Sequence, residues 1–389
     1  MRGDAGKAVS QLDQILLEGK ADTSEWPLLK LERGLAYHHS GQYQESTKDF
    51  EEADAVLEAL DYTSAPMSEV AQYLYSDDAS IYRPPYFEKG LINLINSMNY
   101  LVRSDWSGAL VELRRFDVLI DYWRNREEGF EHLTELIRLK HWMGAFTYLA
   151  RGETGQAELE SERGGFRLPI VQATTEQSLY SPLLVIAQAG QVPHREAMRI
   201  PIGRALLYLG PGHGLSQTER AQLNTLQAKG LVKWVNFPVL SQPIQVDHVL
   251  EINGQKILPT VQVNLGHLAE QDFQKAQTGM MVAAISRLIS RTIVGEAGQA
   301  VVKKSTKNSL LGLLFGLVAE GAMSAADTPD TRSWSSLPNQ ISLYWTWIPK
   351  GSHQISFKAG DTVWTSEKTI VNSPQTFVLS LSPSSKRGE

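Results

Sequence analysis

Hydrophobic residues recur at helical spacing over residues 1–165, whereas short β-branched and alternating runs dominate residues 166–389. The pair Gly164-Gly165 and the polar, proline-spaced segment after it indicate a boundary between the two parts. A chain of 389 residues is also too long for one typical core. We therefore predict a multidomain α+β protein, with a helical domain at residues 1–165 and a β-rich domain at residues 166–389.

The β-rich part has the pattern of an antiparallel β-sandwich. Asn253-Gly254 separates residues 248–252 from residues 255–257 and predicts a hairpin, because Asn-Gly suits a type I′ turn. Near the C-terminus, hydrophobic residues alternate with smaller or polar ones over residues 341–347, and a turn at residues 349–352 leads into a return strand. Further strands are predicted at residues 183–188, 198–202, 232–237, 246–252, 260–263, 363–371 and 376–381.

A helical insertion is predicted between these strands, at about residues 268–326. It contains residues 310–319, LLGLLFGLVA, an apolar stretch that carries no charge. A membrane-spanning helix needs roughly 20 apolar residues, so this stretch is too short to cross a bilayer. A buried helical hairpin, with residues 280–289 in the second helix, is the first interpretation. A partner-binding or peripheral membrane surface is the second.

Residues 31–53 predict a tight helical hairpin, in which small and aromatic residues recur at steps of three and four. Gly34 admits the partner helix, and Gly41 suits the turn between the two helices. The pattern resembles a tetratricopeptide repeat, and a second copy follows near residues 97–116. The resemblance implies an α-solenoid packed through Gly34, Tyr37, Tyr43, Phe50, Ala53, Tyr100, Trp106, Ala109 and Phe116. Half a repeat is expected at the N-terminus. A weak match over residues 145–157 is better explained as an ordinary amphipathic helix pair.

Several local motifs occur in order over residues 82–338: Tyr82 with Tyr86-Phe87-Glu88, Asn99-Tyr100-Leu101, residues 109–115, residues 190–193, residues 330–334 and Leu337-Pro338. With them the chain resembles an uncharacterised bacterial cell-envelope family that joins a tetratricopeptide-like half to a β-rich half. The resemblance implies a periplasmic scaffold near the outer membrane, whose partners are lipoproteins similar to the curli secretion channel. The sequence lacks the acylated cysteine of such lipoproteins and a signal peptide, and it begins inside a repeat. We therefore expect upstream sequence to have been lost.

Charge and composition exclude several kinds of chemistry. The formal charge of −6 argues against nucleic-acid binding, which needs a basic surface. The absence of cysteine excludes disulfides, thiolate metal sites and a cysteine nucleophile. Residues 210–214 are glycine-rich but lack the lysine and hydroxyl of a phosphate loop, so a turn is expected there. His38 and His39 are adjacent on a helix and point about 100° apart, which predicts solvent exposure rather than metal binding.

Two sets of residues are predicted to make contacts. The first is a partner-binding set: Tyr82, Tyr86, Glu88, Glu112, Arg114 and Arg115. The charges among residues 112–115 should face away from the hairpin core, and a plain solvated face is an equally compatible interpretation. The loop at residues 62–85 is interpreted as a cover that packs over the helices, in slight preference to a binding loop. The second set is a joint between the halves, in which Arg332 bridges the insertion and the sandwich through a bidentate carboxylate bond, Asp330 caps a turn and Trp334 is buried.

These features favour a non-enzymatic scaffold or adaptor that binds protein partners through its helical repeats, without a cofactor or metal. The alternative is a glycan- or peptidoglycan-binding module that stacks sugars on Trp345, Trp347 and Trp364. A hydrolase that uses His194 is the least favoured hypothesis, because no nucleophile with a clear base accompanies it. The identity of the partner and the oligomeric state, homomeric or heteromeric, stay open.

Overall fold

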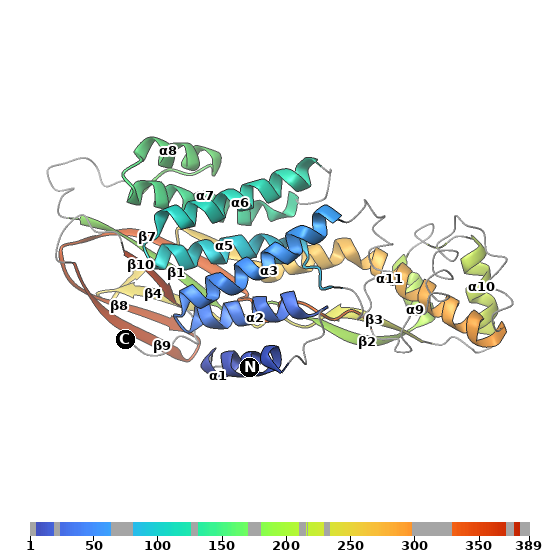
Figure 1. Cartoon of the computed structure of the whole chain (residues 1–389). Helices are drawn as coiled ribbons and strands as arrows, with labels where there is room; N and C mark the ends of the chain where they lie inside the picture. Colours follow the sequence, from blue (N-terminus) through green and yellow to red (C-terminus); the bar gives the residue numbers. More distant parts are fainter. Residues whose placement is uncertain are drawn as a thin grey trace.

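The computed structural model describes residues 5–18, 24–63, 81–125, 131–169, 180–209, 215, 217–228, 234–297, 329–370 and 377–381. The predicted α+β class is confirmed, because helices dominate the N-terminal half and strands the C-terminal half (Figure 1). The N-terminal helices are α1 (Ala5–Leu17), α2 (Trp26–His39), α3 (Tyr43–Thr63), α5 (Tyr86–Val102), α6 (Trp106–Asn125), α7 (Thr134–Ala150) and α8 (Thr154–Arg163), with a short 3-10 turn, η1 (Glu131–Leu133), before α7.

Consecutive helices pack as antiparallel pairs, α2 with α3, α5 with α6, and α7 with α8. Gly41 reverses the chain after α2 with a φ of 79°, a conformation that favours glycine. A Cβ atom on Gly34 would lie 2.8 Å from the ring of Phe50, so the bare glycine backbone permits this close approach. Gly108 is similarly covered by the ring of Tyr100, and the ring of Trp106 meets Phe146 edge to face.

Of the other residues predicted to pack the hairpins, Tyr37 is half-buried and turns towards α1, where its hydroxyl donates to Asp13 at 3.5 Å. Phe50, Ala53, Ala109 and Phe116 are fully buried. Tyr43 is half-buried, and its ring meets His38 edge to face at 5.6 Å. The local hairpin packing therefore follows the spacing of small and aromatic residues, whereas the assignment to a particular repeat family stays a prediction.

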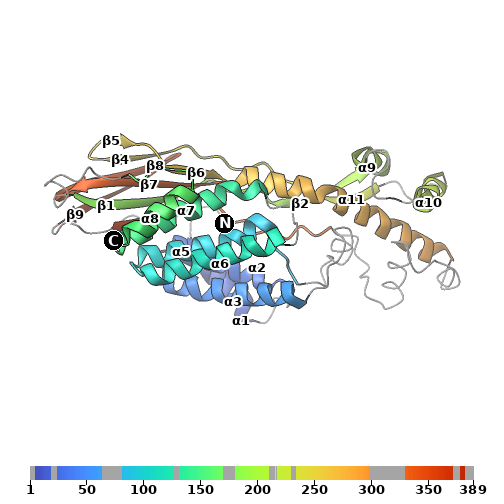
Figure 2. The ribbon, with the colours of Figure 1, turned by 90° about the horizontal axis from the view of Figure 1, so that it is seen from above.

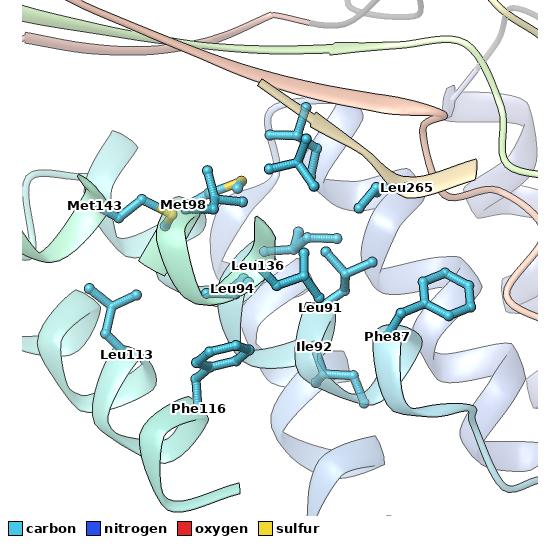
Figure 3. Packing of buried hydrophobic residues seen from close by; sticks show 14 of the residues in the cluster. Phe87, Leu91, Ile92, Leu94, Met98, Leu113, Phe116, Leu136, Met143 and Leu265 are labelled. Carbon is cyan, nitrogen blue, oxygen red and sulfur yellow. The ribbon is translucent and has the colours of Figure 1, made fainter. Parts of the chain in front are cut away.

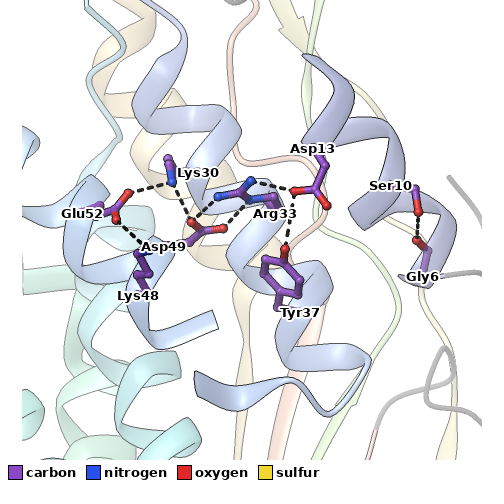
Figure 4. A network of polar contacts seen from close by, with 9 residues as sticks. All are labelled: Gly6, Ser10, Asp13, Lys30, Arg33, Tyr37, Lys48, Asp49 and Glu52. Carbon is purple, nitrogen blue, oxygen red and sulfur yellow. Dashed lines mark hydrogen bonds and ion pairs between the residues drawn. The ribbon is translucent and has the colours of Figure 1, made fainter. Parts of the chain in front are cut away.

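Helix α1 is tied to the next two helices by a polar network (Figure 4). The Arg33 guanidinium on α2 pairs with Asp13 of α1 at 2.7 Å and with Asp49 of α3 at 2.6 Å. The Lys30 ammonium adds contacts of 2.9 Å to Asp49 and 2.7 Å to Glu52. Because Asp49 is buried, it needs these partners, and they set the packing of the first three helices.

Two four-stranded sheets follow. The first has the order β10–β1–β7–β6 and the second the order β5–β4–β8–β9. Asn253 and Gly254 both adopt positive φ between β4 and β5, which confirms the predicted hairpin. The strands are β1 (Tyr180–Ala189), β4 (His248–Ile252), β5 (Gln255–Ile257), β6 (Val261–Asn264), β7 (Gln340–Pro349), β8 (Gly351–Ala359), β9 (Thr362–Ile370) and β10 (Phe377–Leu381).

The expectation of purely antiparallel pairing was wrong. Strand β10 pairs in parallel with β1, whereas the other strand pairs are antiparallel in the described residues. The reason is a change of sheet: β9 belongs to the second sheet and β10 to the first, so the chain crosses between sheets before it pairs. Side chains from both sheets, among them Val185, Tyr344 and Phe357, share one buried cluster.

The opposite face of the first sheet is covered by the helices. Leu184, Ile186 and Leu343 of the sheet belong to the same buried cluster as Leu91 and Leu136 of the helices (Figure 3). The molecule therefore has a helical layer, a first sheet and a second sheet, in that order (Figure 2). The proposed boundary near residue 165 falls between α8 and β1, but the hydrophobic core is continuous across it.

The remaining elements form an extension at one end of the molecule, away from α1–α8, which we call the arm (Figures 1 and 2). It consists of β2 (Arg195–Pro201), α9 (Ile202–Leu209), α10 (Gln217–Ala228), β3 (Trp234–Leu240) and the C-terminal part of α11 (Leu265–Ala297). A second buried cluster, which includes Ile200, Phe237 and Met281, holds it together. Helices α9 and α10 were not predicted.

The predicted helical insertion is represented in the described residues by α11. Met280, Met281 and Ile285 of this helix are buried within the arm. The apolar stretch at residues 310–319 and the glycine-rich segment at residues 210–214 lie outside the described residues, as does most of the loop at residues 62–85. None of the described helices is both long and apolar enough to cross a membrane.

Candidate functional site

Residues of α3, α5 and α6 line a groove of about 270 Å³. Helix α3 contributes the acidic residues Asp54, Glu58 and Asp61, which recur at steps of four and three and so share one helix face. Helix α5 contributes Lys89 and Asn93, one turn apart. The groove is therefore built from regularly spaced positions on three helices, which hold its walls in place.

Helix α6 supplies the remaining wall, and it has two stripes. Leu113, Phe116 and Ile120 form the stripe that is buried in the core. The second stripe runs along the groove and is lined by Val111, Arg114, Arg115, Val118, Leu119 and Tyr122. Both stripes recur at helical spacing, so one helix packs against the core and presents a separate surface at the same time.

Paired charges form the floor of the groove. The Nη2 atom of Arg115 lies 2.6 Å from Oδ2 of Asp54, and its Nη1 atom lies 3.7 Å from the carboxylate of Glu112. The Asn93 amide donates to Asp54 at 3.3 Å and to Glu112 at 3.2 Å. Lys89 pairs with Asp61. Burial raises the pKa of Asp54 and of Glu112, and the charge of Arg115 opposes that rise.

The rim of the groove combines apolar surface with a charge. The side chains of Val111 and Val118 are 49% and 62% exposed, and their spacing of seven residues places them on the same face of α6. Arg114 lies beside them and is exposed. Within the described parts of the chain, no acidic side chain forms an ion pair with Arg114. The rim therefore offers two apolar contacts and one cation to an incoming group.

The predicted partner-binding residues divide between this groove and the interior. Arg114 and Arg115 line the groove, as described. Glu112 was expected to face away from the hairpin core, which is wrong: it is 3% exposed and bonded to Asn93. Tyr86 is half-buried, and its ring meets Trp123 edge to face at 4.9 Å.

Tyr82 and Glu88 are not surface residues, which corrects their assignment to a partner-binding surface. They are 1% and 2% exposed, because the segment before α5 packs between the helices and the chain that leads into β7. The Tyr82 hydroxyl donates to the Glu88 carboxylate, and the backbone N–H of Trp334 donates to Oε2 of Glu88 at 3.2 Å. Burial raises the pKa of Glu88 to about 7, although these hydrogen bonds favour its charged form.

The predicted joint residues lie where the helices meet the first sheet. Trp334 is fully buried, with its ring 5.7 Å from that of Phe50 on α3. The bidentate partner of Arg332 is Asp330 itself, at 2.9 Å and 3.0 Å, and Asp330 also accepts the backbone N–H of Arg332. Glu32 of α2 adds a bond across the joint, because it accepts the backbone N–H of Ser335 at 2.8 Å.

The expected solvent exposure of His38 and His39 was wrong. The end of α2 abuts the first sheet, where His38 is 1% exposed. The contacts favour a neutral tautomer: His38 Nδ1 donates to Asn99 at 2.6 Å, and Gln188 of β1 donates to His38 Nε2 at 2.9 Å. The same Gln188 accepts from His39 at 2.7 Å. Burial lowers the pKa of His38 to about 3. Within the described residues, no group of three or more His, Asp or Glu side chains is arranged to hold a metal.

His194 lies at the end of the β2–β3 pair. Its Nδ1 atom is 2.9 Å from the Ser241 hydroxyl, and its Nε2 atom is 3.3 Å from Glu196. Ser241 also accepts the backbone N–H of His194 at 3.0 Å, and its own N–H donates to the carbonyl of His194 at 2.8 Å. These hydrogen bonds hold the end of the β2–β3 pair together, so His194 and Ser241 have a structural role there.

The tryptophans of the glycan-binding alternative are largely engaged within the protein. Trp345 is 6% exposed and meets Trp142 and Phe146 edge to face at 6.0 Å and 5.1 Å, so it offers no platform for a sugar ring. The indole N–H of Trp347 donates to the carbonyl of Pro169. Trp364 is half-buried beside the cluster between the sheets.

Sequence reasoning missed the acidic wall of the groove and its apolar rim. Asp54, Glu58 and Asp61 do recur on one helix face, and a second stripe on α6 is visible once its core stripe is removed. The acidic face of α3 and the second stripe of α6 come together only in the tertiary structure, where both line one groove with α5. No protein-family model matches the chain, and no significant match was found to a curated protein or a solved structure. The groove is therefore the basis for assigning a function.

Proposed function

We propose that the protein is a non-enzymatic adaptor that binds a segment of a protein partner in the groove between α3 and α6. The observation that carries this proposal is the rim, where exposed Val111 and Val118 flank Arg114, a cation for which the described part of the chain supplies no ion-pair partner. The floor beneath them is already paired, so a ligand gains apolar burial without breaking the buried ion pairs.

The shape of the site favours a helical ligand. Two roughly parallel walls, α3 and α6, present side chains at helical spacing, and an amphipathic helix can place apolar residues at steps of three and four between them. An acidic residue on that helix would complement Arg114. The partner segment is therefore proposed to be an amphipathic helix with an apolar stripe and an acidic flank.

The finer description of the fold and location belongs to the same proposal. The close contacts of Gly34 with Phe50 and of Gly108 with Tyr100 support a tetratricopeptide-like solenoid, and the cluster shared by the two sheets supports a sandwich. The order of motifs over residues 82–338 supports a periplasmic scaffold near the outer membrane, with lipoproteins similar to the curli secretion channel as partners.

The test is recovery of companions from fractionated cells with a chromosomally tagged protein. Wild type is compared with the groove variant Arg114→Glu/Val118→Asp and with the control Leu159→Asp/Arg163→Glu, which changes exposed residues on α8. Both variants are first checked for wild-type thermal unfolding. We expect a stoichiometric companion in the envelope fraction that is lost from the groove variant and kept by the control. If both variants recover the companion equally well, the groove is not its binding site.

A further inference from the structure

The arm carries an exposed surface that combines aromatic and basic side chains. Trp234 at the start of β3 is 45% exposed, and the guanidinium of Arg199 on β2 lies 5.7 Å from its ring centroid. Arg204 in the first turn of α9 is exposed as well. These are the side chains of the small β2–β3 sheet and its neighbouring helix that the buried cluster of the arm leaves uncovered.

The charge of this region is opposite in sign to that of the protein. The whole chain has a formal charge of −6. The described residues of the segment 193–245 nevertheless carry more basic than acidic residues, with Glu196 and Glu219 opposed by Arg195, Arg199, Arg204 and Arg220. A basic region in an otherwise acidic chain has a local positive potential and attracts anions.

The arm extends from one end of the molecule, beyond the ends of α3 and α6 (Figure 2). Its exposed face is supported by Ile200, Phe237 and Met281 beneath it, so the basic and aromatic residues are held on a packed base.

We propose that the arm docks on the surface of an anionic phospholipid bilayer. Tryptophan favours the boundary between headgroups and acyl chains, and arginines near that boundary pair with phosphate groups. A soluble polyanion would use the charges but would leave the indole of Trp234 in water. The bilayer accounts for both the charges and the exposed indole of Trp234, and the proposal does not depend on what occupies the groove.

Sedimentation with lipid vesicles tests this directly. We expect the full-length protein to bind vesicles of phosphatidylglycerol mixed with phosphatidylcholine, more weakly as salt rises, and not to bind phosphatidylcholine alone. Arg199→Glu/Arg204→Glu should weaken binding by roughly 25-fold or more, from about fivefold for each arginine near an anionic surface. The control Arg138→Glu/Arg167→Glu, which reverses exposed charges elsewhere, should bind like wild type. Equal loss in both variants, or no binding to the anionic vesicles, would overturn the proposal.

A second measurement does not depend on the charge-reversal variant. Brominated lipids quench only tryptophans that enter the interface, so quenching of wild type minus that of Trp234→Phe reports the contribution of Trp234. We expect Trp234→Phe to remove most of the quenching in anionic vesicles. Undiminished quenching in this variant would show that another part of the protein contacts the lipid, and it would contradict the proposal.

Discussion

Arg115 on α6 places its Nη2 atom 2.6 Å from Oδ2 of Asp54 on α3, and this ion pair joins the two walls of the groove. Asp54 is 6% exposed, whereas Arg115 is half-buried and also reaches Glu58 at 3.5 Å. Since burial disfavours the Asp54 carboxylate, its charge depends on Arg115 and on the amide of Asn93. The groove thus depends on a contact between helices that are separated in sequence by α5.

Replacing the arginine of this pair should destabilise the protein. Arg115→Leu leaves the Asp54 carboxylate buried without its cation, and we expect a loss of about 1–3 kcal/mol in the free energy of unfolding. Adding Asp54→Asn should recover part of the loss, because the uncompensated charge is removed. Urea denaturation measures both, and Arg114→Leu on the rim is the control, expected within about 0.5 kcal/mol of wild type. Equal stability of the two leucine variants would mean that the pair is energetically neutral.

A methyl group on Gly34 should strain the packing of α2 on α3. The added Cβ would lie 2.8 Å from the Phe50 ring, whose own side chain is fully buried and has little room to move. We expect Gly34→Ala to cost about 1–3 kcal/mol. Gly155→Ala on α8 is the matched control, because its Cβ meets nothing within 4 Å and alanine favours the helix. In thermal unfolding, the Tm of Gly34→Ala should lie below that of wild type and the Tm of Gly155→Ala above it. An unchanged Tm for Gly34→Ala would contradict the close approach of α2 to α3.

Glu88 should make the protein less stable as pH rises towards 8. Burial raises its pKa in the folded state to about 7, from an ordinary value of 4.5, so the folded state binds more protons than the unfolded state between these values. The stabilisation is complete below pH 4.5 and is lost as pH rises through 7, a change of roughly 3 kcal/mol. Glu88→Gln keeps an acceptor for Tyr82 but cannot ionise. Urea denaturation from pH 5 to pH 8 should show a flatter profile for the variant, whereas parallel profiles would contradict this role.

Buried His38 should make the protein less stable as pH falls below 6.5. Burial lowers its pKa in the folded state to about 3, from 6.5, so its contribution is complete above pH 6.5 and is lost as pH falls through 3. Protonation would place an N–H of His38 against the amide donor of Gln188. We expect His38→Gln to lose less stability than wild type between pH 6.5 and pH 4, by roughly 3 kcal/mol. Equal losses in both proteins would indicate that another group controls acid unfolding.

Features that depend on neighbours in sequence were predictable. The hairpin at residues 31–53 follows from its small and aromatic spacing, and the hairpin at Asn253-Gly254 follows from residues that accept positive φ. The strands near the C-terminus follow from alternation, since side chains on a strand point to opposite faces in turn. The α+β class could therefore be predicted from local patterns.

Most of the helices and strands follow from local sequence, because each depends on residues within a few positions of one another. The burial of His38 against Gln188, the parallel pairing of β10 with β1 and the contact of Asp54 with Arg115 arise only when distant elements pack together. These relationships join residues from different elements, and a side chain's exposure or charge state depends on which element packs over it. A periodic stripe predicts that a face exists, but the packing of distant segments decides whether it becomes core, joint or groove.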